Sequence, residues 1–198
     1  MIRAEDIYSY IDTLAPFSTA MDFDNAGLLV GSGAQTVTKG LITLDITHEA
    51  VSRAEEIGAE LLVSHHPVIF SPLKKLSSES VPYRLAGNGM AAICAHTNLD
   101  MAAAGVNFCL AQKLSLRNVR GVSEFCPGAY ILWEGELPEP MDPERFASYV
   151  KEKLGCQAVE LAAGKEQIRT VGLCSGAGAE TTSGASRASG RRLRTSGP

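Results

Sequence analysis

The chain has 198 residues, 45% of them hydrophobic and 20% charged, with a formal net charge of −4. This length suffices for one domain, or for one domain and part of a second, around a sizeable core. No apolar run approaches the ~20 residues of a membrane helix, and the first residues lack the apolar core of a signal peptide. We therefore expect a cytoplasmic protein without membrane partners.

The charges are unevenly distributed along the chain. Residues 1–180 hold all 22 acidic residues and 14 of the 18 basic ones, a balance of −8. A body this acidic is unsuited to wrapping nucleic acid, so no nucleic-acid partner is expected. The five cysteines form no Cys-x-x-Cys pair, which favours reduced thiols over a disulfide framework or a structural zinc site.

In chain order, the first part of the sequence alternates helical and extended patterns. Apolar residues at helical spacing predict a helix over 4–14, which Pro16 ends. Thr47 and Gly58 are suited to begin and end a helix between them. The other predicted elements are strands over 41–46, 61–63 and 91–95 and helices over 82–87 and 105–114. This order is typical of parallel βαβ units, so we predict an α/β fold with a parallel βαβ core.

A different pattern begins near Tyr130. Predicted strands over 130–133 and 168–173 flank a predicted helix over 143–154, with Pro143 at its first position. We therefore expect two lobes. Residues 1–118 are assigned to an N-terminal α/β lobe, and residues 119–180 to a second, incomplete α+β lobe.

The last residues, 181–198, differ from the rest of the chain. They contain four arginines, no acid and little besides Ser, Thr, Gly and Ala, so they cannot form a core. One interpretation is a disordered basic tail. The other, which we favour, is a segment read out of frame, because GC-rich codons read in a shifted frame yield this mixture of residues.

The segment Ser64-His65-His66-Pro67 directly follows a predicted strand. Adjacent strand residues face opposite ways, but Pro67 favours a turn that could bring both imidazoles to one side. Two imidazoles facing one pocket would serve two metal ions more naturally than one. A surface turn with two solvated histidines is the alternative. We favour metal because a second polar strand end lies nearby in the sequence.

That second strand end is Ala95-His96-Thr97-Asn98-Leu99-Asp100. Asp100 is the predicted carboxylate ligand, since a carboxylate can neutralise and bridge divalent cations. His96 is either a residue that orients a ligand, water or substrate, or a histidine satisfied beneath the strand end. Asp45, at the end of the first predicted strand, lines the same crevice or accepts hydrogen bonds from its own turn. His96 and Asp45 are thus the candidate catalytic residues.

Four motifs together resemble one family, the type 2 GTP cyclohydrolase I homologues, also called Nif-three-like dinuclear metal-binding proteins. The segment Asp24-Asn25-Ala26-Gly27, taken alone, predicts a turn as the first interpretation and a substrate contact as the second. The motifs are Asp24-Asn25-Ala26-Gly27-Leu28-Leu29-Val30-Gly31, Leu44-Asp45-Ile46-Thr47, Ser64-His65-His66-Pro67 and His96-Thr97-Asn98-Leu99-Asp100. Their order and spacing resemble the family along roughly the first 110 residues.

The resemblance implies two divalent metal ions per subunit, of zinc, iron, manganese or a similar metal. His65, His66 and Asp100 match the family's N-terminal ligands. It also implies a homo-oligomer, usually a hexamer, and a hydrolase that acts on a guanine nucleotide. The family's remaining ligands are a C-terminal histidine and glutamate, and no histidine follows His96.

Three functions remain open at this point. The first is a metal-dependent hydrolase, in which the metal site activates water. The second is a non-catalytic metal-binding protein that acts as a regulator or scaffold through its oligomer. The third is an inactive, truncated remnant, because three protein ligands are few for two ions.

Overall fold

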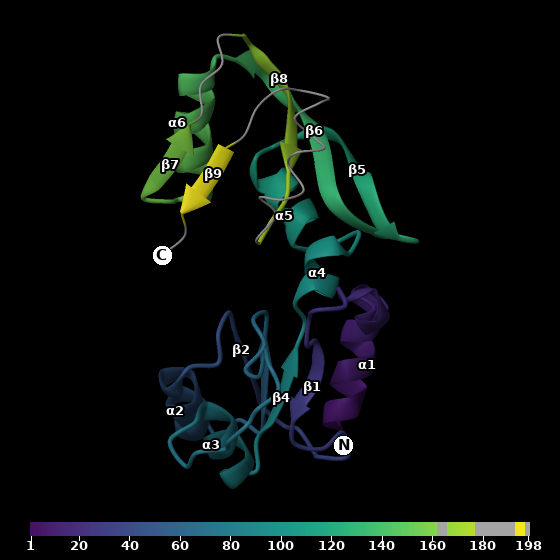
Figure 1. Ribbon diagram of the computed structural model, residues 1–198, viewed down its shortest axis with the longest axis vertical. Helices are drawn as coiled ribbons and strands as arrows, with labels where there is room; N and C mark the ends of the chain where they lie inside the picture. Colours follow the sequence, from purple (N-terminus) through teal and green to yellow (C-terminus); the bar gives the residue numbers. More distant parts are fainter. Residues whose placement is uncertain (162–165, 177–192, 197–198) are drawn as a thin grey trace. The chain divides into compact units, whose positions relative to one another are not determined.

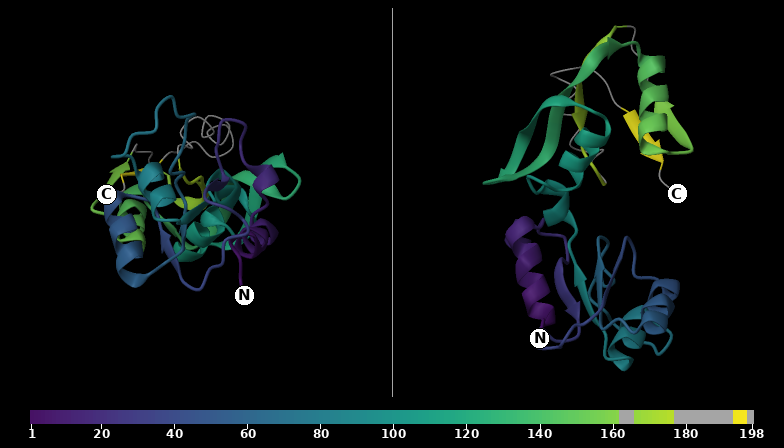
Figure 2. Two further views of the ribbon diagram at one scale, coloured as in Figure 1. Left: turned by 90° about the horizontal axis from the view of Figure 1, so that it is seen from below. Right: turned by 180° about the vertical axis from the view of Figure 1, so that it is seen from behind.

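The computed structural model describes residues 1–161, 166–176 and 193–196 (Figures 1 and 2). The chain divides into two compact units, Met1–Leu99 and Asp100–Pro198. This division falls earlier than the boundary expected after residue 118, because the segment 106–114 packs in the core of the second unit through Ala111 and Leu114. Among the described residues, no helix combines the length and apolar character that a membrane crossing requires.

The first unit is a four-stranded sheet with helices on both faces, in the strand order β1-β4-β3-β2. Strands β2, β3 and β4 are parallel, and β1 pairs antiparallel with β4. The predicted α/β class with a parallel βαβ core is thereby confirmed. The elements are α1 (Ala4–Leu14), the 3-10 helix η1 (Phe17–Thr19), β1 (Gly27–Val30), β2 (Gly40–Thr43), α2 (His48–Ile57), β3 (Leu61–Ser64), α3 (Val81–Gly87), β4 (Ala91–Cys94) and α4 (Thr97–Met101), the last of which contains the division between units.

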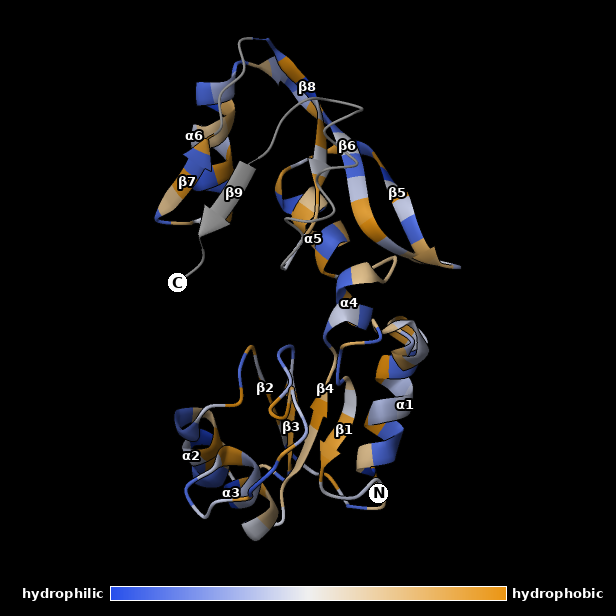
Figure 3. Cartoon of the chain, viewed as in Figure 1, coloured by the Kyte–Doolittle hydropathy of each residue, from blue (hydrophilic) through white to orange (hydrophobic). Residues whose placement is uncertain are grey.

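The strands of this sheet divide their side chains between two cores. Leu61 and Ile93 pack on one face with residues of α1, whereas Leu62 and Ala92 pack on the other face with α2 and α3. This follows from the alternation of side chains along a strand. Because both faces are covered, β4 is buried at every position and runs as an apolar band (Figure 3). A strand that is buried on both faces has a continuous run of hydrophobic residues in its sequence, and this run predicts the strand.

Helix α2 begins and ends as its sequence predicts. The Thr47 side chain accepts a hydrogen bond from the backbone N–H of Ala50, which satisfies one of the N–H groups that have no partner in the first turn. Gly58 ends the helix at φ 67°, a left-handed conformation that side chains with a Cβ rarely adopt. The helix therefore has a defined length, and it returns the chain to the start of β3.

The second unit contains a three-stranded antiparallel sheet in the order β5-β6-β8. Its core lies between this sheet and helices α5 and α6, where Trp133, Phe146, Val171 and Leu173 are buried together. This agrees with the expected α+β character of the segment. The elements are α5 (Val106–Lys113), β5 (Arg117–Cys126), β6 (Ala129–Met141), α6 (Pro143–Leu154), β7 (Ala158–Leu161), β8 (Ile168–Leu173) and β9 (Leu193–Ser196).

Strand β9 lies in the segment for which the sequence favours disorder or a shifted frame. Its backbone pairs antiparallel with β7 from Ala158↔Ser196 to Leu161↔Leu193. These four residues are therefore extended and paired rather than unstructured. The rest of the segment 181–198 lies outside the described residues.

Candidate metal centre

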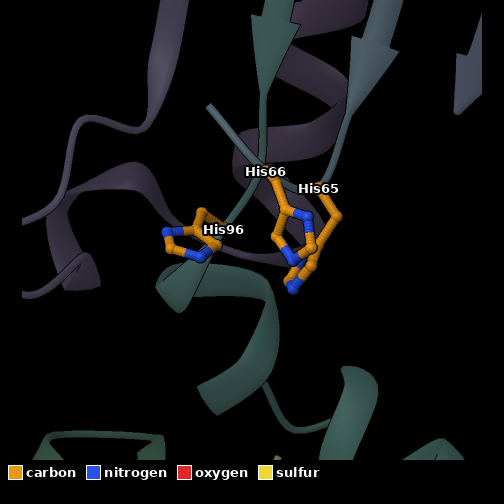
Figure 4. A group of neighbouring side chains, drawn as sticks. All are labelled: His65, His66 and His96. Atoms are coloured by element: carbon orange, nitrogen blue, oxygen red, sulfur yellow. The ribbon is translucent and has the colours of Figure 1, made fainter. Parts of the chain in front are cut away.

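Three histidines that follow β3 and β4 form a cluster (Figure 4). One ring nitrogen from each of His65, His66 and His96 lies within 4.8 Å of the others. The ring centroids are 5.1 Å apart for His65 and His66, 5.2 Å for His65 and His96, and 5.8 Å for His66 and His96. Grouped imidazoles suit zinc, copper, iron and nickel ions. The cluster could therefore hold a metal ion.

The three side chains meet because parallel strands end level with one another. Ser64 of β3 pairs with Thr43 of β2 and with Cys94 of β4, so the residues that follow leave the sheet at one edge. Ligand sites of open α/β sheets collect at this carboxyl edge. A turn then brings both adjacent histidines to one side, as predicted, with the Ser64 hydroxyl donating to the carbonyl oxygen of His66 at 2.8 Å.

Strand β2 ends three residues before the predicted end at residue 46. The Thr43 hydroxyl donates a hydrogen bond to the carbonyl oxygen of Asp45 at 2.9 Å, and the chain bends at this point. Asp45 therefore lies beyond the strand, and its carboxylate contacts His66 instead of lying within the sheet. The sequence predicts Asp45 at the end of the strand, whereas in the structure it follows Thr43, the last residue of β2, by two positions.

Each ring of the cluster is held at Nδ1 by an oxygen acceptor. A carbonyl or carboxylate oxygen accepts from a ring N–H, so Nδ1 carries a proton and Nε2 of a neutral ring carries the lone pair. Nε2 is thus the ring atom suited to bind a metal ion, and the bond at Nδ1 fixes the ring, as the outer partners of metal-bound histidines do. The acceptors are Ala95 O for His65 at 2.9 Å, Asp45 Oδ1 for His66 at 2.7 Å and Asp24 Oδ1 for His96 at 2.8 Å.

Asp24 is the most enclosed carboxylate of this site. Its side chain is 0% exposed, and it also accepts hydrogen bonds from the backbone N–H of Thr97 at 3.0 Å, from the Thr97 hydroxyl and from the backbone N–H of Asn25 at 2.7 Å. Burial acts to raise the pKa of Asp24, but the hydrogen bonds from Thr97 and His96 outweigh it and hold the pKa below its usual value. The protein thus keeps a negative charge beside His96.

Cys94 lies next to the cluster but is not one of its grouped side chains. Its Sγ donates to the carbonyl oxygen of His65 at 3.0 Å. Burial, with the charge of Asp24, raises the pKa of this thiol to about 12. In this structure the thiol serves as a hydrogen-bond donor to the backbone of the cluster.

An aromatic side chain borders the cluster. The Phe70 ring lies edge-on to His96, with 6.3 Å between centroids and 86° between planes, and about half of Phe70 is exposed. The Asn25 amide donates to the carbonyl oxygen of Ile69 at 2.5 Å and so holds this loop near the Asp24 segment. An apolar surface beside converging polar groups is typical of small-molecule sites.

The structure shows which of the predicted site residues lie together. His65, His66 and His96 share one cluster, and Asp45 supports His66. Asp100 belongs to the second unit, where its Oδ1 accepts a hydrogen bond from the Ser175 hydroxyl at 2.7 Å. Ligation by Asp100 and catalytic roles of His96 and Asp45 stay predictions.

Sequence reasoning missed the role of Asp24. Its motif, Asp24-Asn25-Ala26-Gly27, carries the composition of a turn, and the partner His96 lies 72 positions away. The sequence predicted a turn first and a substrate contact second for this motif, and the hydrogen bond to His96 was not expected from either.

An α/β sheet with three imidazoles at the ends of neighbouring parallel strands defines this chain as a candidate metal-binding protein. The family model described as Duf34/NIF3 (NGG1p interacting factor 3) matches residues 2–189, and the chain belongs to this family. The family suspected from the motifs is thereby confirmed.

Relatives and solved structures agree with this assignment. A "GTP cyclohydrolase 1 type 2 homolog" of Clostridium perfringens is 30% identical over 184 residues, covering 89% of this chain and 70% of that protein. A protein of the same name from Staphylococcus aureus is 38% identical over 121 residues, covering 60% of this chain but 33% of its own length. This chain therefore matches about a third of that relative.

Among solved structures, a hypothetical protein of Staphylococcus aureus superimposes with a TM-score of 0.87 at 26% identity, over 95% of this chain and 76% of that one. A Bacillus cereus protein related to NIF3 superimposes with a TM-score of 0.83 at 20% identity, over 94% of this chain and 80% of that one. The second likeness shows the fold alone.

Proposed function

We propose that this protein is a metal-dependent hydrolase whose divalent ions are bound by His65, His66 and Asp100, with His96 of the same cluster as a further ligand. The observation that carries the proposal is the arrangement at Nδ1, where all three imidazoles of the cluster donate to an oxygen acceptor. Histidines of a surface turn do not need such partners, whereas metal-ligating histidines almost always have them.

The residues of the cluster have distinct tasks in this proposal. A divalent ion bound there would lower the pKa of a coordinated water and polarise an oxygen of the substrate. Asp24 and Asp45 hold His96 and His66 in the tautomer that presents Nε2. Their negative charges also offset that of a cation, which neutral imidazoles cannot do. Imidazole with carboxylate suits zinc, iron or manganese, and two ions per subunit is the number we propose.

The substrate class proposed first is a guanine nucleotide. Support comes from the printed name of the relatives, "GTP cyclohydrolase 1 type 2 homolog". The half-exposed ring of Phe70 beside His96 offers an apolar surface for a planar ring. A homo-oligomer, with the hexamer as the form to test, completes the proposal.

The test is the metal content per chain of the purified protein after incubation with zinc or manganese and gel filtration. We expect near-stoichiometric metal in the wild type and its loss in His65→Ala and Asp100→Ala. His48→Ala is the matched control, because His48 is the fourth histidine, is exposed and begins α2 outside the cluster. A folded wild type that retains no metal, or equal loss in the His48 variant, would refute the proposed site.

A second function has one observation in its favour. The matching family model is described by an interaction, as NGG1p interacting factor 3, and not by a reaction. A metal-binding regulatory or scaffold protein would bind metal without turning over a nucleotide. Release of product from GTP, dependent on added metal and lost in His65→Ala, supports the hydrolase. Full metal loading with no turnover supports the scaffold.

A further inference from the structure

Asp100 lies at the centre of a hydrogen-bond network within the second unit. The Ser175 hydroxyl donates to Asp100 Oδ1 at 2.7 Å. Asn107, which is 1% exposed, donates from Nδ2 to the carbonyl oxygen of Asp100 at 3.0 Å and accepts from the backbone N–H of Ser175 at 2.6 Å. Each of the three residues therefore contacts the other two.

The supports of Asp100 come from well-packed elements. Asn107 is in the first turn of α5, whose Ala111 is fully buried in the core. Ser175 follows β8 closely, and Leu173 at the end of that strand is also buried in this core. Both donors are therefore anchored by hydrophobic packing, so they can hold Asp100 in one position without rearranging.

The two supports differ in purpose. Asn107 binds a backbone carbonyl at the end of α4 and the backbone of Ser175, which satisfies peptide groups that a helix end and a turn leave without partners. The Ser175 hydroxyl instead donates to the side chain of Asp100. Asp100 is half-buried, and this bond joins two side chains without satisfying any backbone group. It selects one rotamer of the carboxylate.

We propose that Ser175 is a positioning residue for Asp100 and thereby raises the affinity of the protein for its metal. The proposal rests on the proposed function, in which Asp100 is a ligand. A hydrogen bond from Ser175 leaves the carboxylate its negative charge and fixes the direction in which its oxygens point. Removing such a support from a metal ligand typically weakens metal binding about 10- to 100-fold. Asn107 acts one step further out, by holding the backbone of Ser175.

The experiment measures the zinc dissociation constant by competition with a chromophoric chelator. We expect Ser175→Ala to weaken zinc binding about tenfold and Ser175→Thr, which keeps the hydroxyl, to restore it. Ser123→Ala removes an exposed serine of β5 and serves as the control with unchanged affinity. Asp100→Ala gives the effect of losing the ligand itself.

A second readout separates positioning from general stability. Cobalt is substituted for zinc, and the visible absorption bands, which depend on ligand geometry, are compared. We expect them to differ between wild type and Ser175→Ala and to return in Ser175→Thr, while urea unfolding of the metal-free proteins shows both samples to be folded. If Ser175→Ala does not fold, Ser175→Cys, a weaker donor of similar size, is expected to weaken binding in the same direction.

The possible failures are distinguishable. Wild-type affinity and spectrum in a folded Ser175→Ala, with binding lost in Asp100→Ala, would overturn the positioning role and leave the metal site standing. Unchanged binding in Asp100→Ala would remove Asp100 from the ligands and overturn the inference with it. A wild type that binds no zinc would overturn the proposed function itself.

Discussion

Replacing Asp24 by Asn tests whether the buried carboxylate orients His96 for metal binding. Asp24 accepts four hydrogen bonds, with His96 and Asn25 at Oδ1 and the N–H and hydroxyl of Thr97 at Oδ2. An asparagine has one accepting oxygen and one donating NH₂ group. The NH₂ group must point either toward Nδ1–H of His96 or toward the backbone N–H of Thr97. In both orientations two hydrogen-bond donors face each other. If the NH₂ group faces His96, the ring moves its proton to Nε2 and can no longer bind metal there.

The expected magnitude follows from burial. Mutation of an outer partner of a metal ligand typically costs 10- to 100-fold in affinity. The Asp24 side chain is 0% exposed, whereas that of Asp45 is 54% exposed and water can replace its bond to His66. We therefore expect about 100-fold for Asp24→Asn, or about 2.7 kcal/mol, and about tenfold or less for Asp45→Asn, its matched control.

Zinc affinity is measured by isothermal titration calorimetry or by chelator competition on samples shown to be folded by circular dichroism. Nitrogen-15 spectra of the histidine rings report directly which nitrogen carries the proton. A folded Asp24→Asn protein with wild-type affinity and His96 still protonated at Nδ1 would refute the reasoning. Equal losses in both variants would contradict the argument from burial.

Three further predictions concern stability and reactivity. Glu60 accepts hydrogen bonds from the hydroxyl and N–H of Thr38, which, with the N–H of the next residue, lower its pKa to about 2. Its contribution to stability is therefore present above pH ~4.5 and lost as the pH falls toward 2, and Glu60→Gln should flatten the acid limb of a thermal-unfolding profile. Leu85→Ala, at a fully buried position of α3, should lower the free energy of unfolding in urea by about 2–5 kcal/mol. Ellman's reagent at pH 8 should label the exposed Cys109 at once and Cys94 only on unfolding.

The first unit was largely predictable because its local signals agree with its fold. Thr47 and Gly58 marked the ends of α2, and the apolar runs of β3 and β4 indicated strands covered on both faces. Helices between such strands imply parallel pairing, since the crossover needs them. The pairing of β1 antiparallel to β4 was not visible, because strand direction at the sheet edge depends on how the preceding loop returns.

The second unit was predicted less completely. Strand β5 was missed, and β6 was expected over 130–133 although it extends from Ala129 to Met141. The stretch Glu134–Pro140 contains three glutamates, two prolines and a glycine around Leu137, a composition that in sequence is hard to distinguish from a loop. In the structure, Leu137 and Met141 reach the core while the residues between them are exposed. Strand β6 extends this far because it pairs with β5 along a hairpin and with β8, whose residues lie far from it in the sequence.

The two carboxylates at Nδ1 give the cluster a charge that the sequence does not reveal. Three neutral imidazoles would present a divalent cation with dipoles alone, whereas ionised Asp24 and Asp45 add negative charge one ring away from the metal-binding atoms. Asp24 stays ionised despite its burial, because Thr97 and His96 donate to it and its pKa is lowered. A buried anion is costly to maintain unless something offsets it. Here the hydrogen bonds offset it in the protein alone, and a bound cation would offset it further. The buried carboxylate therefore makes this strand edge better suited to a cation than to an anion.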